Sequence, residues 1–289
     1  MSAARKLAGR SGRSAVRNST HVLVLRRLRY GETSLVADLL TAEHGRVSIL
    51  ARGAYRATSR FYCVLDWFHR LELTWCERPG PALALLERGD VDRSRRSIPQ
   101  DLGSYRAAHS AIELVERVSR PGDPGRDLFE RLDGFLEALD RSAGRPADLL
   151  ARFDLGLLAE LGLAPALGDC ARCGRRAPQP GKGPQQSAFS AAAGGRLCPT
   201  CADSIRREGG TVGQLPAAVL ERAASLAGSR AGQVAPAPQQ EQALARFLER
   251  FLVHHLESGL PARQGHPSAQ PAQPPKPSPT GARIAGRQG

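Results

Sequence analysis

Lysine is almost absent from this chain: only Lys6, Lys182 and Lys276 occur among its 41 basic residues. Arginine therefore supplies nearly all of the positive charge. An arginine excess has two interpretations, a compositional bias of the genome or a need for planar, bidentate phosphate binders. The composition does not separate them, so the positions of the arginines matter more than their number.

Long apolar runs are also absent. No segment approaches the roughly 18 apolar residues of a membrane-spanning helix, so we expect no membrane span. Residues 1–19 are basic but lack the apolar core of a signal peptide, and they also lack the amphipathic pattern of a transit peptide. We expect them to form a disordered arm. Six cysteines in a long chain without a secretory signal indicate reduced thiols and a cytoplasmic protein.

The sequence holds no recognisable catalytic motif. The patterns GxxxxGK[ST], GxGxxG and HExxH do not occur, and the serine, histidine and aspartate residues follow no known arrangement. Asp38, Glu43 and Asp66 do not form a visible cluster of carboxylates. A nuclease would need such a cluster and a divalent metal, so we predict that the chain is not an enzyme.

The positive charge is concentrated in the N-terminal third. Residues 1–100 hold 18 bases and 9 acids, residues 101–260 hold 19 of each, and residues 261–289 hold 4 bases and no acid. A uniform compositional bias would give the middle segment a surplus as well. The N-terminal third therefore has the charge expected of a surface that binds a polyanion.

Residues 20–96 show the pattern of short β-strands. In residues 46–52, Val47, Ile49 and Ala51 alternate with polar residues, and residues 70–75 alternate in the same way. Turn residues separate about five such segments within about 70 residues, which predicts a small barrel or sandwich.

The period then changes to that of α-helices. Residues 97–168 contain three amphipathic segments separated by breaks at 121–125 and 143–146, and residues 206–260 contain two more. We expect the second group to pack on the first. Residues 261–289 are rich in Pro, Gln, Ala and Gly, and we expect this tail to be disordered.

Two Cys-x-x-Cys pairs, Cys170/Cys173 and Cys198/Cys201, are the strongest local signal. Each pair can bend around one tetrahedral ion, and two pairs complete a zinc site of four cysteines within a module at residues 169–205. The 24-residue gap between the pairs is longer than usual for a zinc ribbon, but its Pro/Gly-rich sequence can loop out. Redox dithiols or unrelated cysteines are the alternative. Four thiolates leave no open position on zinc, so we expect a structural metal.

Basic residues surround this module, namely Arg172, Arg175, Arg176 and Lys182. They can contact nucleic acid, but charged residues in a loop more often face only solvent. We therefore favour a solvated loop over a nucleic-acid contact here.

A second basic segment, residues 51–62, interleaves arginines with aromatic residues. Arginines follow a phosphate backbone and aromatic rings stack on unpaired bases, so a loop of this kind on a small barrel suits single-stranded nucleic acid. A second cluster of arginines lies in residues 26–29, beside a predicted strand. The candidate nucleic-acid-binding residues are Arg26, Arg27, Arg29, Arg46, Arg52, Tyr55, Arg56, Arg60 and Phe61.

Three segments of the chain form a recognisable set. The first contains the motifs Tyr30-Gly31-Glu32, Thr41, Gly45, Ala51-Arg52-Gly53 and Ser59-Arg60-Phe61. The others are the "ARFDLGLLAELGLAPALGDCARCG" run into the first cysteine pair, and "FSAAAGGRLCPTC", which closes the module. On these segments the chain resembles the RecO family of recombination mediators over about residues 20–255.

The resemblance implies an α+β multidomain protein without enzymatic turnover. Its expected parts are an arm at 1–19, a five-stranded OB-fold at 20–96, a helical domain at 97–168, a zinc module at 169–205, C-terminal helices at 206–260 and a tail at 261–289. It implies binding to single- and double-stranded DNA, annealing of complementary strands, and action with RecR to load RecA onto DNA coated by single-strand-binding protein. It places the protein in the bacterial cytoplasm at the nucleoid.

The helical domain is expected to offer an apolar pocket to the acidic, apolar C-terminal tail of single-strand-binding protein. The alternative function is a different kind of binding: an OB-fold and zinc-ribbon protein that acts on RNA in translation or transcription. That alternative predicts a preference for RNA and no response to single-strand-binding protein.

Overall fold

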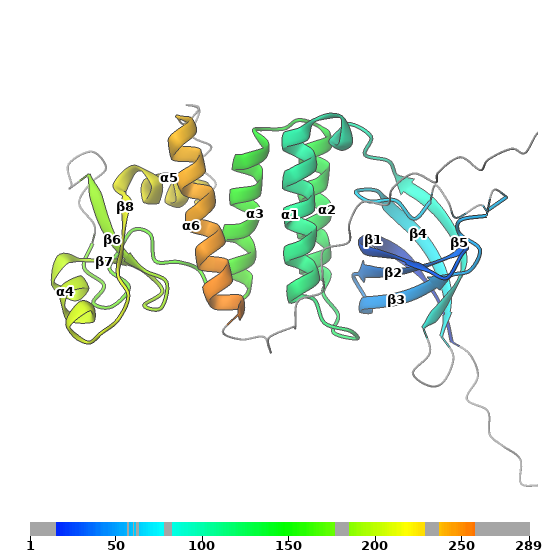
Figure 1. Cartoon of the computed structure of the whole chain (residues 1–289), viewed down its shortest axis with the longest axis horizontal. Helices are drawn as coiled ribbons and strands as arrows, with labels where there is room; N and C mark the ends of the chain where they lie inside the picture. The colour runs from blue at the N-terminus through cyan, green and yellow to red at the C-terminus, as the bar shows by residue number, and fades with distance from the viewer. Residues whose placement is uncertain are drawn as a thin grey trace, which may run out of the picture.

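The computed structural model describes residues 16–56, 58, 59, 61, 64–77, 83–176, 185–228 and 237–257. A barrel forms one end of an elongated molecule, helices fill the middle, and the cysteine module forms the other end (Figure 1). This arrangement confirms the expected α+β multidomain class. The expected tail and most of the expected arm lie outside the described residues.

The N-terminal strands close into a five-stranded barrel in the order β1-β2-β3-β5-β4. All neighbouring strands are antiparallel except β3 and β5, which pair in parallel. This is the closed, partly mixed barrel of an OB-fold, as the sequence predicts. The strands are β1 Val16–Tyr30, β2 Ser34–Thr41, β3 Gly45–Ala51, β4 Arg70–Glu77 and β5 Ala84–Arg93.

Strand β1 is buried on both faces. Val22 and Val24 point into the barrel core, whereas Leu23 and Leu25 pack against the helices. Burial on both faces explains why this strand has a continuous apolar run instead of an alternating pattern. The strand also begins at Val16, so residues 16–19 pair with β4 and do not belong to the arm to which the sequence analysis assigned them.

Three helices follow the barrel, as the sequence pattern predicts: α1 Leu102–Val118, α2 Arg126–Asp140 and α3 Pro146–Glu160. Asp101 caps α1 by accepting a hydrogen bond from the Ser104 N–H at 2.7 Å. Two later helices, α5 Ala217–Ala227 and α6 Pro238–Glu257, pack on α3 and extend the bundle (Figure 1). In the part of the chain that the structure describes, no helix combines the length and apolar character needed to cross a bilayer.

The cysteine module contains regular structure that the sequence pattern did not indicate. Its elements are β6 Gln186–Ser190, β7 Gly195–Leu197, α4 Pro199–Arg207 and β8 Gly213–Pro216, and the sheet order is β7-β6-β8. Strand β8 lies beyond residue 205, so the sheet of the module extends further than the predicted boundary. These strands have three to five residues each, too few to show a period.

The turn between β2 and β3 needs a glycine. Gly45 has φ +63°, and a Cβ at this position would lie 2.2 Å from the Asp123 carbonyl oxygen. The neighbouring Arg46 N–H donates to the Arg120 carbonyl at 3.1 Å. Backbone contact between this turn and the α1–α2 connection therefore joins the barrel to the helical domain.

A fully buried arginine makes the second connection between these domains. Arg95, in the segment after β5, has no solvent exposure. Its guanidinium donates to the Asp133 carboxylate at 2.6 Å, to the Glu137 carboxylate at 3.4 Å and to the Phe68 carbonyl at 2.9 Å. The acids belong to α2 and Phe68 precedes β4, so one side chain links both domains.

Replacing Arg95 by alanine should destabilise the barrel. The Phe68 carbonyl would lose its donor and each acid would lose one partner, which costs about 1–3 kcal/mol even though Arg70 and Arg93 still pair with the acids. The only two tryptophans, Trp67 and Trp75, lie in the barrel or its long loop, so urea unfolding followed by tryptophan fluorescence reports on this domain. Arg96→Ala is the control, because Arg96 is exposed and donates to the nearby Ser94 hydroxyl. Equal unfolding midpoints for the two variants would contradict the proposed role of Arg95.

Candidate functional site

The four cysteines of the module converge on one point. Their sulfur atoms all lie within 4.8 Å of one another, and the Sγ atoms of Cys173 and Cys198 are 3.8 Å apart. A tetrahedral ion with metal–sulfur bonds of about 2.3 Å places its ligands about 3.8 Å from each other. The sulfur geometry therefore fits a thiolate-bound metal and is too wide for a disulfide.

Local backbone structure explains this convergence. Gly174 takes φ +70°, and its N–H donates to the Cys170 carbonyl at 2.8 Å, which closes the first turn. Cys198 occupies the N-cap of α4 and Pro199 follows it within the first turn of the helix, a favoured place for proline. Cys201 then faces the first pair from the same helical turn.

The closely spaced thiols have pKa values that are shifted in opposite directions. Burial raises the pKa of Cys170, but backbone N–H groups of Cys198, Cys173 and Arg172 stabilise its thiolate and lower the pKa to about 6. The Cys201 thiol instead donates hydrogen bonds to its neighbours, first Cys198, and these stabilise its protonated form and raise its pKa to about 12. Sulfur atoms this close cannot all ionise unless a cation offsets their charge, and a metal ion supplies that charge.

Mutation of one ligand should release the metal. We expect about one metal ion per purified chain and its loss in Cys173→Ser, because three thiolates leave the ion under-coordinated. Elemental analysis by mass spectrometry measures this ratio. Cys76→Ser is the matched control, since Cys76 is a free, half-buried cysteine of β4. Equal metal content in the two variants would contradict the assignment of the ligands.

The second candidate site is the open end of the barrel. A β-bulge between Val24 and Arg26 shifts the alternation of β1. Beyond the bulge, Arg27 and Arg29 pair with Ala37 and Leu35, which belong to the inner face of the barrel. Residues directly opposite each other share a face, so these two arginines line the end of the barrel.

Both arginines at this end lie over aromatic rings. Arg29 lies 5.5 Å from the Tyr55 ring centroid, which joins the two basic segments that the sequence analysis treated separately. Arg27 lies 5.7 Å from the Trp67 ring and donates to Asp66 at 2.8 Å. Trp67 was not among the predicted residues, and its place in the loop after residue 62 gave no signal.

Arg26 and Arg46 lie elsewhere. Arg26 is on the outer face of β1 and forms an ion pair with Glu116 of α1 at 3.8 Å. Arg46 donates to the Glu116 carbonyl at 3.0 Å. The structure thus separates these two arginines from the predicted group and places them at the contact between barrel and helices.

The predicted loop keeps two exposed arginines, Arg52 and Arg56. Tyr55 and Phe61 are half-buried and pack against the barrel core, so each ring presents only part of its surface. Arg60 lies outside the described residues. The loop, together with Arg29, forms a compact basic surface that we call the barrel end: Arg29, Arg52, Tyr55 and Arg56.

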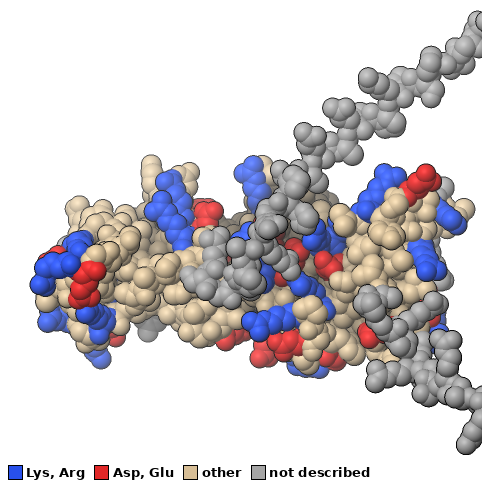
Figure 2. All heavy atoms as spheres, turned by 60° about the horizontal axis from the view of Figure 1, so that its bottom comes forward, with Lys and Arg blue, Asp and Glu red and all other residues tan. Residues whose placement is uncertain are grey.

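Several arginines of the N-terminal third form ion pairs with carboxylates. Arg17, Arg70 and Arg93 each pair with a carboxylate at 2.9 Å or less, and Arg95 is buried between two acids. These arginines are therefore less available to a phosphate than the exposed Arg52 and Arg56. Figure 2 shows basic side chains on the barrel, over the helices and on the cysteine module.

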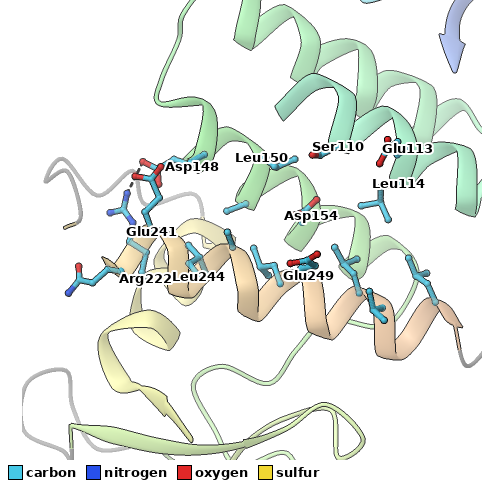
Figure 3. Close-up of a pocket in the computed structure, with 18 of the residues that line it drawn as sticks. Ser110, Glu113, Leu114, Asp148, Leu150, Asp154, Arg222, Glu241, Leu244 and Glu249 are labelled. Atoms are coloured by element: carbon cyan, nitrogen blue, oxygen red, sulfur yellow. Dashed lines mark hydrogen bonds and ion pairs between the residues drawn. The ribbon is translucent and has the colours of Figure 1, made fainter. Parts of the chain in front are cut away.

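A third feature is a groove of about 580 Å³ between α1, α3 and α6 (Figure 3). Its floor is apolar, with Leu114, Leu150 and Leu244 among its residues. Carboxylates dominate its polar lining. The acidic residues are Glu113, Asp148, Asp154, Glu241 and Glu249, and the basic ones are Arg117 and Arg222. The groove therefore suits neutral or basic groups better than acidic ones.

Asp154, at the bottom of this groove, should make stability depend on pH. The side chain is 8% exposed, and burial raises its pKa to about 7 from an ordinary value of about 3.9. The folded chain thus keeps a proton that the unfolded chain releases, so stability falls as pH rises from about 4 to about 7.

Asp154→Asn removes this titration and should flatten the pH dependence over that window. At pH 8 the variant should be more stable by on the order of 2–4 kcal/mol. Urea unfolding at several pH values measures the slope. Glu249→Gln, which changes an exposed carboxylate of the same groove, should leave the slope nearly unaltered. A slope that persists in Asp154→Asn would contradict the assignment.

An OB-type barrel, a helical domain and a four-cysteine module together define the class of the protein, an α+β multidomain protein with a candidate metal site. Comparison with known families then identifies the family of this chain. Residues 17–95 match "Recombination protein O N terminal" and residues 99–264 match "Recombination protein O C terminal". The chain belongs to the RecO family.

Named relatives agree over most of the chain. The DNA repair protein RecO of Anaeromyxobacter sp. (strain K) is 40% identical over 243 residues, which cover 84% of this chain and 92% of that protein. The RecO protein of Myxococcus xanthus is 34% identical, covering 81% and 90%, and that of Streptomyces coelicolor is 31% identical, covering 82% and 94%. The family consists of recombination mediators that are not enzymes, as the sequence analysis predicts.

Proposed function

We propose that this chain is a DNA-binding recombination mediator of DNA repair that binds single- and double-stranded DNA and anneals complementary strands. The observation that carries the proposal is the barrel end, where Arg29 lies on Tyr55 beside the exposed Arg52 and Arg56, in a chain of the RecO family. Arginines contact the phosphates, and the exposed part of the tyrosine ring offers a surface for an unpaired base.

Annealing of this kind needs no nucleotide fuel. Two strands repel each other through their phosphates, and arginine contacts reduce that repulsion while the bases remain free to pair. The paired product is lower in free energy, so the protein only has to lower the electrostatic barrier. Because the contacts release counterions, affinity and annealing should fall steeply with salt.

The proposed partners follow from the family. With RecR, the chain helps to load RecA onto DNA coated by single-strand-binding protein, and it works in the bacterial cytoplasm at the nucleoid. The acidic, apolar tail of single-strand-binding protein binds the helical part of the molecule. The groove of Figure 3 does not suit that tail, because Glu113, Glu241 and Glu249 would repel its acidic residues.

The metal in this proposal is zinc, held by Cys170, Cys173, Cys198 and Cys201. Four thiolates in tetrahedral positions are the ligand set of structural zinc, and they leave no site for a substrate. Zinc supplies the connection between the two cysteine pairs and thereby stabilises the module. The cysteine module contains few buried apolar residues, so the metal contributes much of its stability.

Strand annealing tests the proposal. Two complementary labelled oligonucleotides, each coated with single-strand-binding protein from the same organism, are mixed with and without the chain in the absence of nucleotide. We expect faster pairing, and we expect Arg52→Glu/Arg56→Glu to slow it by at least about tenfold because two phosphate contacts become repulsive.

Arg88→Glu/Arg96→Glu is the matched control, since it reverses two exposed arginines outside the basic loop. The control should retain most of the acceleration, which separates a local site from the effect of net charge. An RNA pair without single-strand-binding protein forms a further arm of the experiment. Acceleration of RNA pairing alone would replace the proposal with RNA binding, and an equal loss in both double variants would remove the barrel end as the site.

A further inference from the structure

The cysteine module carries a local charge that the sequence average conceals. Residues 101–260 are neutral as a whole, but residues 169–208 contain seven bases and three acids, a surplus of four. Four of these arginines surround one depression of about 400 Å³ beside the metal ligands. They are Arg175, Arg176, Arg196 and Arg206.

Chain segments distant in sequence build this depression. Arg175 and Arg176 follow the first cysteine pair, Arg196 lies on β7, and Arg206 lies on α4. Among the described residues, the only acid in its lining is Asp203, which forms an exposed ion pair with Arg206 at 2.9 Å. Such a pair contributes little, so Arg206 can exchange Asp203 for a stronger anion.

The remaining polar lining also suits an oxyanion. The side-chain amides of Gln186 on β6 and Gln214 on β8 lie at the rim, where each can donate hydrogen bonds. Cys198 and Pro199, which begin α4, form another wall, and the start of a helix favours negative charge. Guanidinium groups bind phosphate in a bidentate manner, so the donor set matches phosphate oxygens.

We infer that this depression is a second nucleic-acid site, which binds the phosphate backbone of a strand. The cysteine module that contains it lies at the opposite end of the molecule from the barrel (Figure 1). One chain therefore holds two separate strand segments. The inference rests on the proposed function, which identifies the polyanion as DNA. It goes beyond that function because it adds a second site and a second bound strand.

Nearby charge offers a competing explanation for these arginines. A zinc ion with four thiolates carries a net charge of about −2, and positive side chains can serve only to offset it. Arg172 lies between Cys170 and Cys173 in the sequence, but its guanidinium already pairs with Glu208 at 3.1 Å. A purely structural role predicts that reversing the arginines of the depression releases metal and leaves strand binding unchanged.

The test counts bound strands by native mass spectrometry, with DNA oligonucleotides too short to reach both ends of the molecule. The unaltered chain should bind two oligonucleotides. Arg175→Glu/Arg196→Glu, in the depression, and Arg52→Glu/Arg56→Glu, at the barrel end, should each bind one, and the combination should bind none. Arg106→Glu/Arg246→Glu reverses two exposed arginines outside both sites and should bind two.

Salt dependence gives an independent readout. Loss of two phosphate contacts should reduce the slope of log affinity against log salt by about 1.4 for single strands. Metal content, measured in the same samples, should stay at one ion per chain in Arg175→Glu/Arg196→Glu. Loss of the metal from this variant without loss of a bound strand would establish the structural role instead.

The outcomes separate this inference from the proposed function. If the chain binds one oligonucleotide and the barrel-end variant abolishes it, the second site is refuted while the barrel end stands. If the barrel-end variant still binds two, the proposed barrel site is refuted. A polyglutamate peptide of equal charge that binds the depression when DNA does not would overturn the inference in favour of an acidic protein partner.

Discussion

The buried guanidinium of Arg95 fixes the relative position of the barrel and the helices. A charge without solvent exposure is tolerated only where partners surround it, and here the partners come from both domains: Asp133 and Glu137 on α2, and the Phe68 carbonyl before β4. Moving the domains apart would separate the buried guanidinium from both carboxylates, although Glu137 would keep its ion pair with Arg141. Arg95 therefore holds the barrel on the helical domain.

This contact also determines which barrel surfaces remain available. The outer faces of β1 and β2 bury Leu23, Leu25 and Leu40 against the helices, and Arg26 and Arg46 reach the same contact. The bulge at residue 25 turns the following arginines to the opposite side of the strand. Because of this one bulge, Arg26 lies at the contact between the domains, whereas Arg27 and Arg29 line the end of the barrel.

Sequence reasoning predicted the elements with strong periodicity and failed where the signal is short or depends on distant residues. The barrel, the helices and the four cysteines follow from alternation, helical period and ligand spacing. The strands of the cysteine module, of three to five residues, show no period. In the sequence, Arg26 and Arg29 look alike because both belong to one basic run. Only the pairing register of β1 gives them different roles. The buried charge of Arg95 likewise depends on α2, about 40 residues away.

Net charge averaged over long segments also hid where the basic residues lie in the folded chain. When charge is summed over residues 101–260, the acids of α1, α2 and α3 cancel the basic residues of the cysteine module. The helices and the module nevertheless occupy different parts of the molecule (Figure 1). The surplus of bases over acids therefore lies in the N-terminal third and in the cysteine module. With strands bound at both proposed sites, the chain would not press them together, but it would confine them to one molecular length, where effective concentrations reach about the millimolar range. This confinement would shorten the search between tethered strands and would add to the reduced phosphate repulsion, and neither contribution requires nucleotide or a catalytic group.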